Sequence, residues 1–416
     1  MVSKKIKEIV DGRVFRNMSW LGSAELVNRV FRLATTVTLA RYFSQKEYGL
    51  MAIIYISFDF AFVFIRSGIT AKIVQTDDES LQSICDTSYW INWIACIMAF
   101  CIQCLAAYPI SQFYGSIDLF LPLCFCSLTY LTFPFFLIKA ALIERGNKMK
   151  AIAFIHAAQS ITASLMIVGL VVLGLGIWSI ALAMFFSTLL WAVVNVLDTS
   201  WKRPKKITFK GWKKVATFSK NVLGVELLNK LRSNLDYLIV GKFLSVDDLG
   251  FYYFAFNAGS GITMNIVNTF VWALYPHLCS IRADPPKFKI EYFKNLKVIM
   301  LSIALVVMLQ SSLSQFYVPV VFGMKWIPAI PVLILICISV VPVSLKLVSS
   351  ILLNADDKPE VSLYFDIFYT AVFALSILSV VQYGVYWVAV AVLICHSVMS
   401  IIFSILASKK VFGSAL

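Results

Sequence analysis

Charged side chains stand inside long apolar segments of the chain, and their spacing brings them together. Glu25, Arg29 and Arg32 follow one another at intervals of four and three residues, so a helix would carry them within about 60° of one another. Glu226 and Lys230 repeat the first pair 201 residues later. Such a strip can hold an anionic group, and arginine suits phosphate because its planar fork donates two hydrogen bonds at once.

Three further polar residues, Asn229, Arg232 and Asp236, form a strip beside the second pair. Pairing within each helix, at i and i+4, would neutralise one acid and one base per segment. It leaves Arg32 and Arg232 without a carboxylate at that spacing. Because a charge at the bilayer centre costs about 3 kcal/mol or more, we expect these side chains to face a hydrated cavity that receives an anion. The expected ligands of the anion are Arg29, Arg32, Asn229, Lys230 and Arg232.

Carboxylates in the apolar segments suggest a second chemistry, the binding of a coupling cation. Asp59, Glu25 and Asp366 are each able to bind H⁺ or Na⁺, as membrane carboxylates do in many transporters. The sequence does not select among them. Glu226 and Asp236 are candidates for the same role or for charge pairing with neighbouring bases. We expect no other cofactor and no metal site.

The elements that carry these residues are predicted to be membrane-spanning helices. Hydrophobic residues make up 60% of the 416 residues and charged residues 14%, which excludes an ordinary soluble protein. A bilayer core about 30 Å thick requires about 20 apolar residues per helix. Twelve runs of that length predict an all-α polytopic membrane protein: 15–43, 48–66, 83–106, 117–140, 150–173, 177–198, 214–240, 249–277, 293–318, 327–353, 361–382 and 385–407.

Lysine and arginine are distributed unequally among the loops that these runs define. With the N-terminus in the cytoplasm, the cytoplasmic segments hold 28 of the 36 basic residues, the outer loops hold four and the spans hold four. This asymmetry follows the positive-inside rule, so both termini are predicted to be cytoplasmic. The charges in the first run also predict that no cleavable signal sequence is present.

Two halves of the chain repeat one another at a constant offset of 201 residues. The stretch 39–49 matches 240–250 without a gap. Copies six spans apart enter the membrane from the same side, which is typical of transporters with a substrate site between two lobes. The predicted parts are a cytoplasmic N-terminal segment (1–14), an N-lobe (15–198), a basic cytoplasmic linker (199–213), a C-lobe (214–407) and a cytoplasmic C-terminus (408–416).

Several other classes of function are disfavoured. The net charge of +14 could suggest nucleic acid, but the linker bases are better explained by contact with anionic lipid. The nine cysteines and three histidines complete no metal-binding or catalytic motif. We therefore predict that the protein is not an enzyme and does not bind nucleic acid.

Five segments carry recognisable patterns: Leu39–Leu50 (LARYFSQKEYGL), Asn234–Leu244 (NLDYLIVGKFL), Leu249–Tyr252 (LGFY), Leu274–Ser280 (LYPHLCS) and Tyr317–Pro328 (YVPVVFGMKWIP). They resemble the Wzx-type oligosaccharide flippases of the polysaccharide transporter family, within the multidrug/oligosaccharidyl-lipid/polysaccharide exporter superfamily. The resemblance covers nearly the whole chain. One departure is that many relatives carry two further helices after the twelfth.

The resemblance implies a flippase for an undecaprenyl-diphosphate-linked oligosaccharide repeat unit. It would work by alternating access in the bacterial inner membrane, in O-antigen or exopolysaccharide synthesis. Implied partners are the lipid-linked substrate, membrane lipids, and a polysaccharide polymerase with its chain-length machinery. Two alternatives stay open. A cation-coupled multidrug antiporter of the same superfamily would want a carboxylate-lined cavity, and a membrane polysaccharide polymerase would want a large outer loop.

Overall fold

A computed structural model describes residues 13–66, 68–146, 149–196, 201, 204, 206–209 and 212–413. These residues are helical almost throughout and contain no strand, so the predicted all-α class is confirmed. The chain divides into two compact units, Met1–Phe43 with Leu50–Asn234, and Ser44–Gly49 with Leu235–Leu416. Each unit therefore takes in part of a helix that continues into the other. The lobe boundaries expected at the basic linker stay a prediction.

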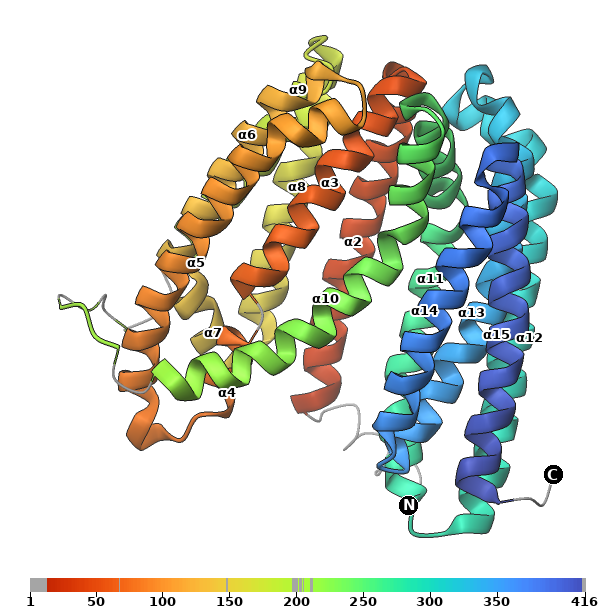
Figure 1. Ribbon diagram of the computed structural model, residues 1–416. Coiled ribbons are helices and arrows are strands. Elements are labelled where there is room, and N and C mark those ends of the chain that lie inside the picture. The colour runs from red at the N-terminus through yellow and green to blue at the C-terminus, as the bar shows by residue number, and fades with distance from the viewer. Residues whose placement is uncertain are drawn as a thin grey trace. The chain divides into compact units, whose positions relative to one another are not determined.

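The first unit contains ten helical elements and the first part of an eleventh among the described residues (Figure 1). They are α2 (Arg13–Tyr42), α3 (Gln45–Arg66, from Leu50 on), α4 (Ile69–Gln75), α5 (Asp78–Phe113), η1 (Ile117–Leu119), α6 (Phe120–Ser127), η2 (Leu128–Phe135), α7 (Leu137–Arg145), α8 (Met149–Val172), α9 (Trp178–Val196) and α10 (Trp212–Phe243, as far as Asn234).

The second unit contains the rest of α10 and the first turn of α3, followed by a bundle of long helices. Within this unit α13 packs against α11, α12 and α15, and α14 packs against α15. Its further elements are α11 (Val246–Ile281), α12 (Pro285–Tyr317), η3 (Val318–Phe322), η4 (Met324–Ala329), α13 (Ile330–Ala355), α14 (Pro359–Val380), η5 (Val381–Tyr383) and α15 (Val385–Phe412).

The twelve predicted runs correspond to long helical segments of the described chain, and the fourth run needs a correction. Residues 117–140 are not one α-helix, because α6 is only eight residues long and gives way to the tighter helix η2 before α7 begins. Pro134 lies inside η2. Proline lacks an N–H and its ring clashes with the preceding turn, so an unbroken α-helix is disfavoured there.

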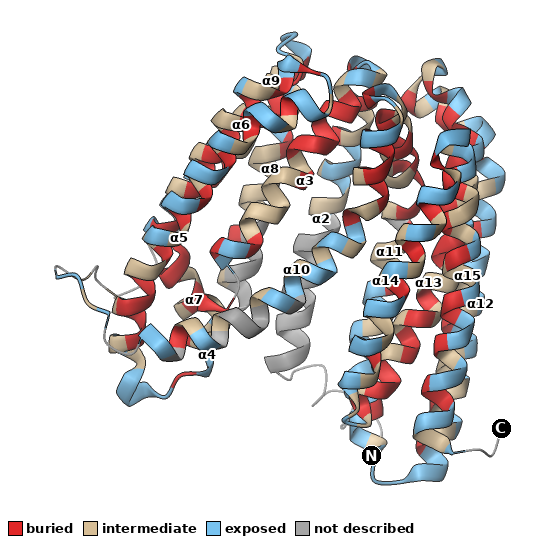
Figure 2. Ribbon diagram, viewed as in Figure 1, coloured by how far each residue is buried: buried red, intermediate tan, exposed pale blue. Residues whose placement is uncertain are grey.

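Seven helical segments of the described residues are long and apolar enough to cross a membrane. Large apolar side chains on their surfaces are bare: Leu105 is 77% exposed, Phe316 71% and Leu375 68%. Figure 2 shows exposed residues along the whole length of α12 and α14. Surfaces of this kind are stable against lipid tails and not against water. The protein is therefore a multi-pass membrane protein.

The sequence repeat corresponds to matching capping interactions at the starts of α3 and α11. Ser44 and Glu47 bond to each other's backbone N–H at 3.2 and 2.8 Å, and Ser245 and Asp248 do the same at 3.0 and 3.3 Å. Each pair is a capping box, which satisfies N–H groups that a helix start leaves without partners. The two boxes stand 201 residues apart, like the rest of the repeat.

Glycines at the same offset let these two helix starts cross closely within the second unit. A Cβ on Gly49 would lie 2.0 Å from the carbonyl oxygen of Val246, and a Cβ on Gly250 would lie 2.0 Å from that of Gln45. Only glycine fits at such a distance. The repeated Glu/Asp-x-Gly pattern therefore encodes one reciprocal contact between two helix starts.

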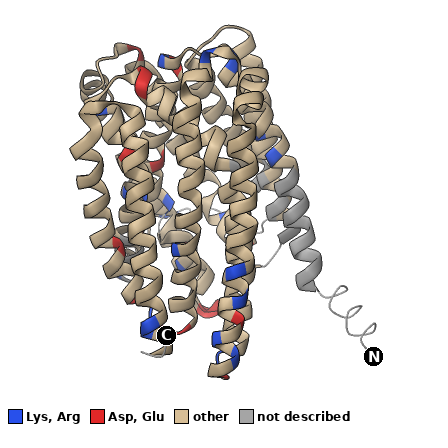
Figure 3. Ribbon diagram, turned by 90° about the vertical axis from the view of Figure 1, so that its right-hand side faces the viewer, with Lys and Arg blue, Asp and Glu red and all other residues tan. Residues whose placement is uncertain are grey.

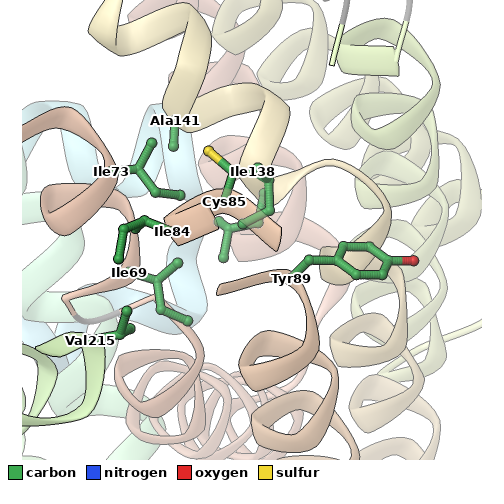
Figure 4. Close-up of a cluster of buried hydrophobic side chains, with 9 residues drawn as sticks. Ile69, Ile73, Ile84, Cys85, Tyr89, Ile138, Ala141 and Val215 are labelled. Carbon is green, nitrogen blue, oxygen red and sulfur yellow. The ribbon is translucent and has the colours of Figure 1, made fainter. Parts of the chain in front are cut away.

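A cluster of buried apolar side chains from α4, α5, α7 and α10 stabilises the first unit (Figure 4). Arg145, at the end of α7, stabilises the same region. It donates to the carbonyl of Ile73 at 3.1 Å, donates to that of Thr76, and pairs with Asp78 at 2.6 Å. The guanidinium of Arg145 lies at the C-terminus of α4, where it satisfies backbone carbonyls that have no partner within the helix. The members of the cluster are Ile69, Ile73, Ile84, Cys85, Tyr89, Leu137, Ile138, Ala141 and Val215.

Candidate functional site

Two of the predicted site residues, Asp59 and Lys230, meet in the first unit. The ammonium nitrogen of Lys230 on α10 lies 2.5 Å from Oδ2 of Asp59 on α3. Both side chains keep access to their surroundings, with 39% of Lys230 and 44% of Asp59 exposed. The structure therefore shows Lys230 paired between helices, with a carboxylate 171 positions away in the chain.

The pair lies deep within its helices. Lys230 stands 13 residues before the end of α10, and Asp59 stands 14 residues after the start of α3. At 1.5 Å per residue these positions are about 20 Å from the turns at Ser44 and Ser245. Because a bilayer core is about 30 Å thick, charges at this depth are stable only beside water or a polar ligand. An accessible ion pair at this depth is expected to face water or a polar ligand.

Other polar residues of α10 extend from this pair. Glu226 and Asn229 are exposed, one turn or less before Lys230. Nη2 of Arg232 donates to Oδ1 of Asn229 at 3.2 Å. Asn234 ties the helix locally by donating to the carbonyl of Lys230 at 2.9 Å. The predicted strip on α10 is thus a set of accessible polar side chains, and Lys230 among them is paired with Asp59.

The first strip is described in part. Arg29 is half-buried and Arg32 is exposed on α2, which packs against α8. Arg29 stands 15 residues before the capping serine Ser44, and Lys230 stands 15 residues before Ser245. The side chain of Glu25 lies outside the described residues, so its predicted pairing or coupling role stays a prediction.

Asp236 is a satisfied buried carboxylate in the second unit. It is 5% exposed and accepts hydrogen bonds from the hydroxyl of Tyr252 at 2.8 Å and from the backbone N–H of Tyr237 at 3.0 Å. The bond from Tyr252 joins α10 to α11. A carboxylate held by neutral donors can keep its charge or take up a proton, and its predicted coupling role stays open.

Asp366 has a partner that sequence reasoning missed. It forms an ion pair with Lys346, and Lys346 is 7% exposed in α13. The positive-inside count places Lys346 with the cytoplasmic positions, but the structure places it nine residues inside the end of α13. Figure 3 shows basic residues at both ends of the helices, among them several near the end that carries the C-terminus. Lys346 is the one charged residue of the stretch 330–355, and its isolation there could have identified it from the sequence.

The arrangement can hold an anion reversibly. A lysine beside one carboxylate, with amide and guanidinium donors along the same helix, offers charge-assisted hydrogen bonds to phosphate oxygens. Among the side chains that the structure describes, no group of three or more His, Cys, Asp or Glu could hold a metal ion. Nothing in the strip resembles a nucleophile with its base.

Comparison with known proteins agrees with this description. A family model described as "Polysaccharide biosynthesis protein" matches residues 38–331. The lipopolysaccharide biosynthesis protein WzxC of Escherichia coli (strain K12) is 24% identical over 408 residues, which cover 95% of this chain and 81% of that protein. A membrane protein in the cps region of Klebsiella pneumoniae is 22% identical, over 97% of this chain and 84% of that one.

Solved structures share the fold at low sequence identity. The lipid II flippase MurJ, in an inward closed conformation, superposes with a TM-score of 0.78 at 14% identity, covering 94% of this chain and 88% of that one. An inward-facing multidrug resistance MATE transporter of the MOP superfamily gives 0.72 at 12% identity, covering 92% and 94%. This protein therefore belongs to the polysaccharide biosynthesis protein family and has the fold shared by MurJ and the MATE transporters.

Proposed function

We propose that this protein moves a lipid-linked oligosaccharide repeat unit, held through its anionic diphosphate, from the cytoplasmic to the outer leaflet of the bacterial inner membrane. The observation that carries the proposal is the accessible Asp59–Lys230 pair deep within helices of a polysaccharide biosynthesis protein. A half-exposed ammonium can exchange its carboxylate for a phosphate oxygen without first leaving a buried position.

The substrate ligands in this proposal are Arg29, Arg32, Asn229, Lys230 and Arg232. The lipid tail stays in the bilayer while two lobes rock between inward-open and outward-open states. The names of relatives support this role, since one is a lipopolysaccharide biosynthesis protein and a structural neighbour is a lipid II flippase. Both termini lie in the cytoplasm, the chain performs no catalysis, and a polymerase with chain-length machinery uses the delivered unit.

A multidrug antiporter is the second candidate, because the MATE transporters share the fold. It requires carboxylates to attract cationic drugs. The described residues proposed for the site on α2, α3 and α10 are four bases (Arg29, Arg32, Lys230 and Arg232), one amide (Asn229) and two acids (Asp59 and Glu226). That balance favours an anionic ligand.

Deletion of the gene tests the proposed function, with surface polysaccharide and lipid-linked intermediates measured in the same cells. A flippase defect removes the polysaccharide and leaves complete lipid-linked units facing the cytoplasm. If the units instead face outward and stay unpolymerised, the protein acts as a polymerase. Normal polysaccharide with increased drug sensitivity would mean a multidrug antiporter.

Substitution of two arginines tests the proposed ligands. Arg32→Ala and Arg232→Ala should each reduce export roughly tenfold or more, since a hydrogen bond to a charged group contributes about 1.5–3 kcal/mol. Lys409→Ala is the matched control, because Lys409 is exposed in the last turn of α15. Full export by the Arg32/Arg232 double variant, inserted at normal levels, would remove both residues from the site.

A further inference from the structure

Four polar side chains from three helices meet inside the second unit, apart from the diphosphate ligands. Lys346 of α13 pairs with Asp366 of α14, and its ammonium lies 5.3 Å from the ring centre of Tyr369, also on α14. The hydroxyl of Tyr369 is hydrogen-bonded to Nδ1 of His396 on α15. The ring of Phe373 stacks on the imidazole, with 5.2 Å between the ring centres and 7° between the planes.

This cluster stands in the most apolar part of the chain. All three helices are among those long and apolar enough to span a membrane. Lys346 lies nine residues before the end of α13, and Asp366 lies seven residues after the start of α14. These distances correspond to roughly 10–14 Å from the turn that joins the helices. A buried pair adds little stability over apolar residues of the same size, so its presence points to function.

The cluster is neutral when His396 is neutral, because one ammonium balances one carboxylate. Imidazole is the side chain that ordinarily changes charge between pH 5 and pH 8. One added proton converts the ring to an imidazolium and gives the cluster a net charge of +1. The imidazolium carries hydrogens on both nitrogens, so Nδ1 then donates to the oxygen of Tyr369, whichever neutral tautomer was present before. The proton thus fixes the direction of the bond between α14 and α15.

We propose that Lys346, Asp366, Tyr369 and His396 form a proton-binding site, with His396 as the group that takes up the proton. Tyr369 of α14 contacts the imidazole directly. Lys346 of α13 joins the cluster over the ring of Tyr369, and Asp366 of α14 joins it through the ion pair with Lys346. The described helices α13 and α15 contain no carboxylate. In α14, Asp366 is the one carboxylate that follows the first turn.

The occupant is a proton and not an alkali cation, because the Lys346 ammonium already occupies the carboxylate that such a cation would need. Hard cations require several oxygen ligands at once, whereas a proton requires one lone pair. The role of the site, which is to couple a proton to transport, rests on the proposed function. Its chemistry does not depend on the identity of the transported molecule.

Nuclear magnetic resonance of the imidazole tests the site directly in the full chain in lipid nanodiscs. The chain has three histidines, so a His156→Gln/His277→Gln background leaves His396 as the one observed ring. The ring should titrate between pH 5 and pH 8. Asp366→Asn should move the midpoint, because it changes the charge of the cluster. Tyr369→Phe should also move the midpoint, while Tyr383→Phe, at an exposed tyrosine of η5, should not.

A ring that stays in one protonation state from pH 5 to pH 8 would overturn the proposal. A midpoint that neither Asp366→Asn nor Tyr369→Phe moves would overturn it as well. This measurement does not need a polysaccharide substrate. A chain that titrates as proposed but fails to export polysaccharide would disprove the proposed function and leave the proton site standing.

Discussion

Lys230 has two roles open to it, as the counter-ion of Asp59 and as a ligand for an anion. The two roles predict different patterns of loss. If Lys230 binds the diphosphate, Lys230→Met should reduce export about ten- to hundredfold, whereas Asp59→Asn should reduce it far less because the ammonium remains. Export of surface polysaccharide, normalised to the amount of inserted protein, measures the difference.

Two controls separate these roles. Lys230→Arg keeps a cation at the position and should retain most export. The double variant Asp59→Asn/Lys230→Met removes both charges of the pair, so it should be as impaired as Lys230→Met alone if Lys230 is a ligand. Equal loss in the two single variants, relieved in the double variant, would show that Lys230 only neutralises Asp59.

The Lys346–Asp366 pair predicts a different kind of effect, on folding stability. Lys346→Met leaves a mostly buried carboxylate without its partner, at a cost of about 3–5 kcal/mol. Lys346→Met/Asp366→Leu removes both charges and should recover most of that loss. Thermal unfolding of the purified protein in detergent measures both. Arg282→Met is the control, since Arg282 and its partner Asp357 are 43% and 74% exposed and a pair so exposed contributes little. Equal unfolding temperatures for the single and double variants would contradict this prediction.

The crossing of α3 and α11 carries a prediction about helix elements. Gly49→Ala and Gly250→Ala each place a methyl group where a backbone carbonyl lies 2.0 Å away, so the helix starts must separate. We expect a large loss of folded protein, seen as a smaller monodisperse peak in size-exclusion chromatography of membrane extracts. Gly261→Ala, on α11, is the matched control because no atom lies within 4 Å of its added carbon. Alanine is the better helix former by about 1 kcal/mol, so that variant should fold normally.

Helices were more predictable than their interruptions. Apolar runs of spanning length located the long segments because burial in lipid needs only composition and length. The break in the fourth run depends on how residues 120–145 pack, and Pro134 alone does not specify which tighter turn replaces the α-helix. The repeat indicated that Gly49 and Gly250 are equivalent, but only the structure shows that each leaves room for a backbone carbonyl of the other helix.

The sequence predicted which residues could form the site, but not which of them contact each other. Charges in apolar runs singled out Asp59 and Lys230, yet their contact spans 171 positions and no local pattern contains it. Lys346 was overlooked because a single lysine ten residues before a turn resembles a residue of the loop. His396 and Tyr369 are 27 positions apart on neighbouring helices, so only packing shows their hydrogen bond.

At the scale of the whole molecule, the proposed direction of transport requires a fixed orientation in the membrane. The turns at 114–116, 173–177 and 384 should be outside, and those at 282–284 and 356–358 should be inside, because the basic residues gather beside the second set. Alkaline phosphatase is active only outside and green fluorescent protein fluoresces only inside a bacterial cell. Fusions of the phosphatase after Gly115 and Gly384 should be active, and a fusion after Asp357 should be inactive. Green fluorescent protein joined after Phe412 should fluoresce. An inverted pattern would place the basic ends outside, and a diphosphate made in the cytoplasm could not then follow the proposed route.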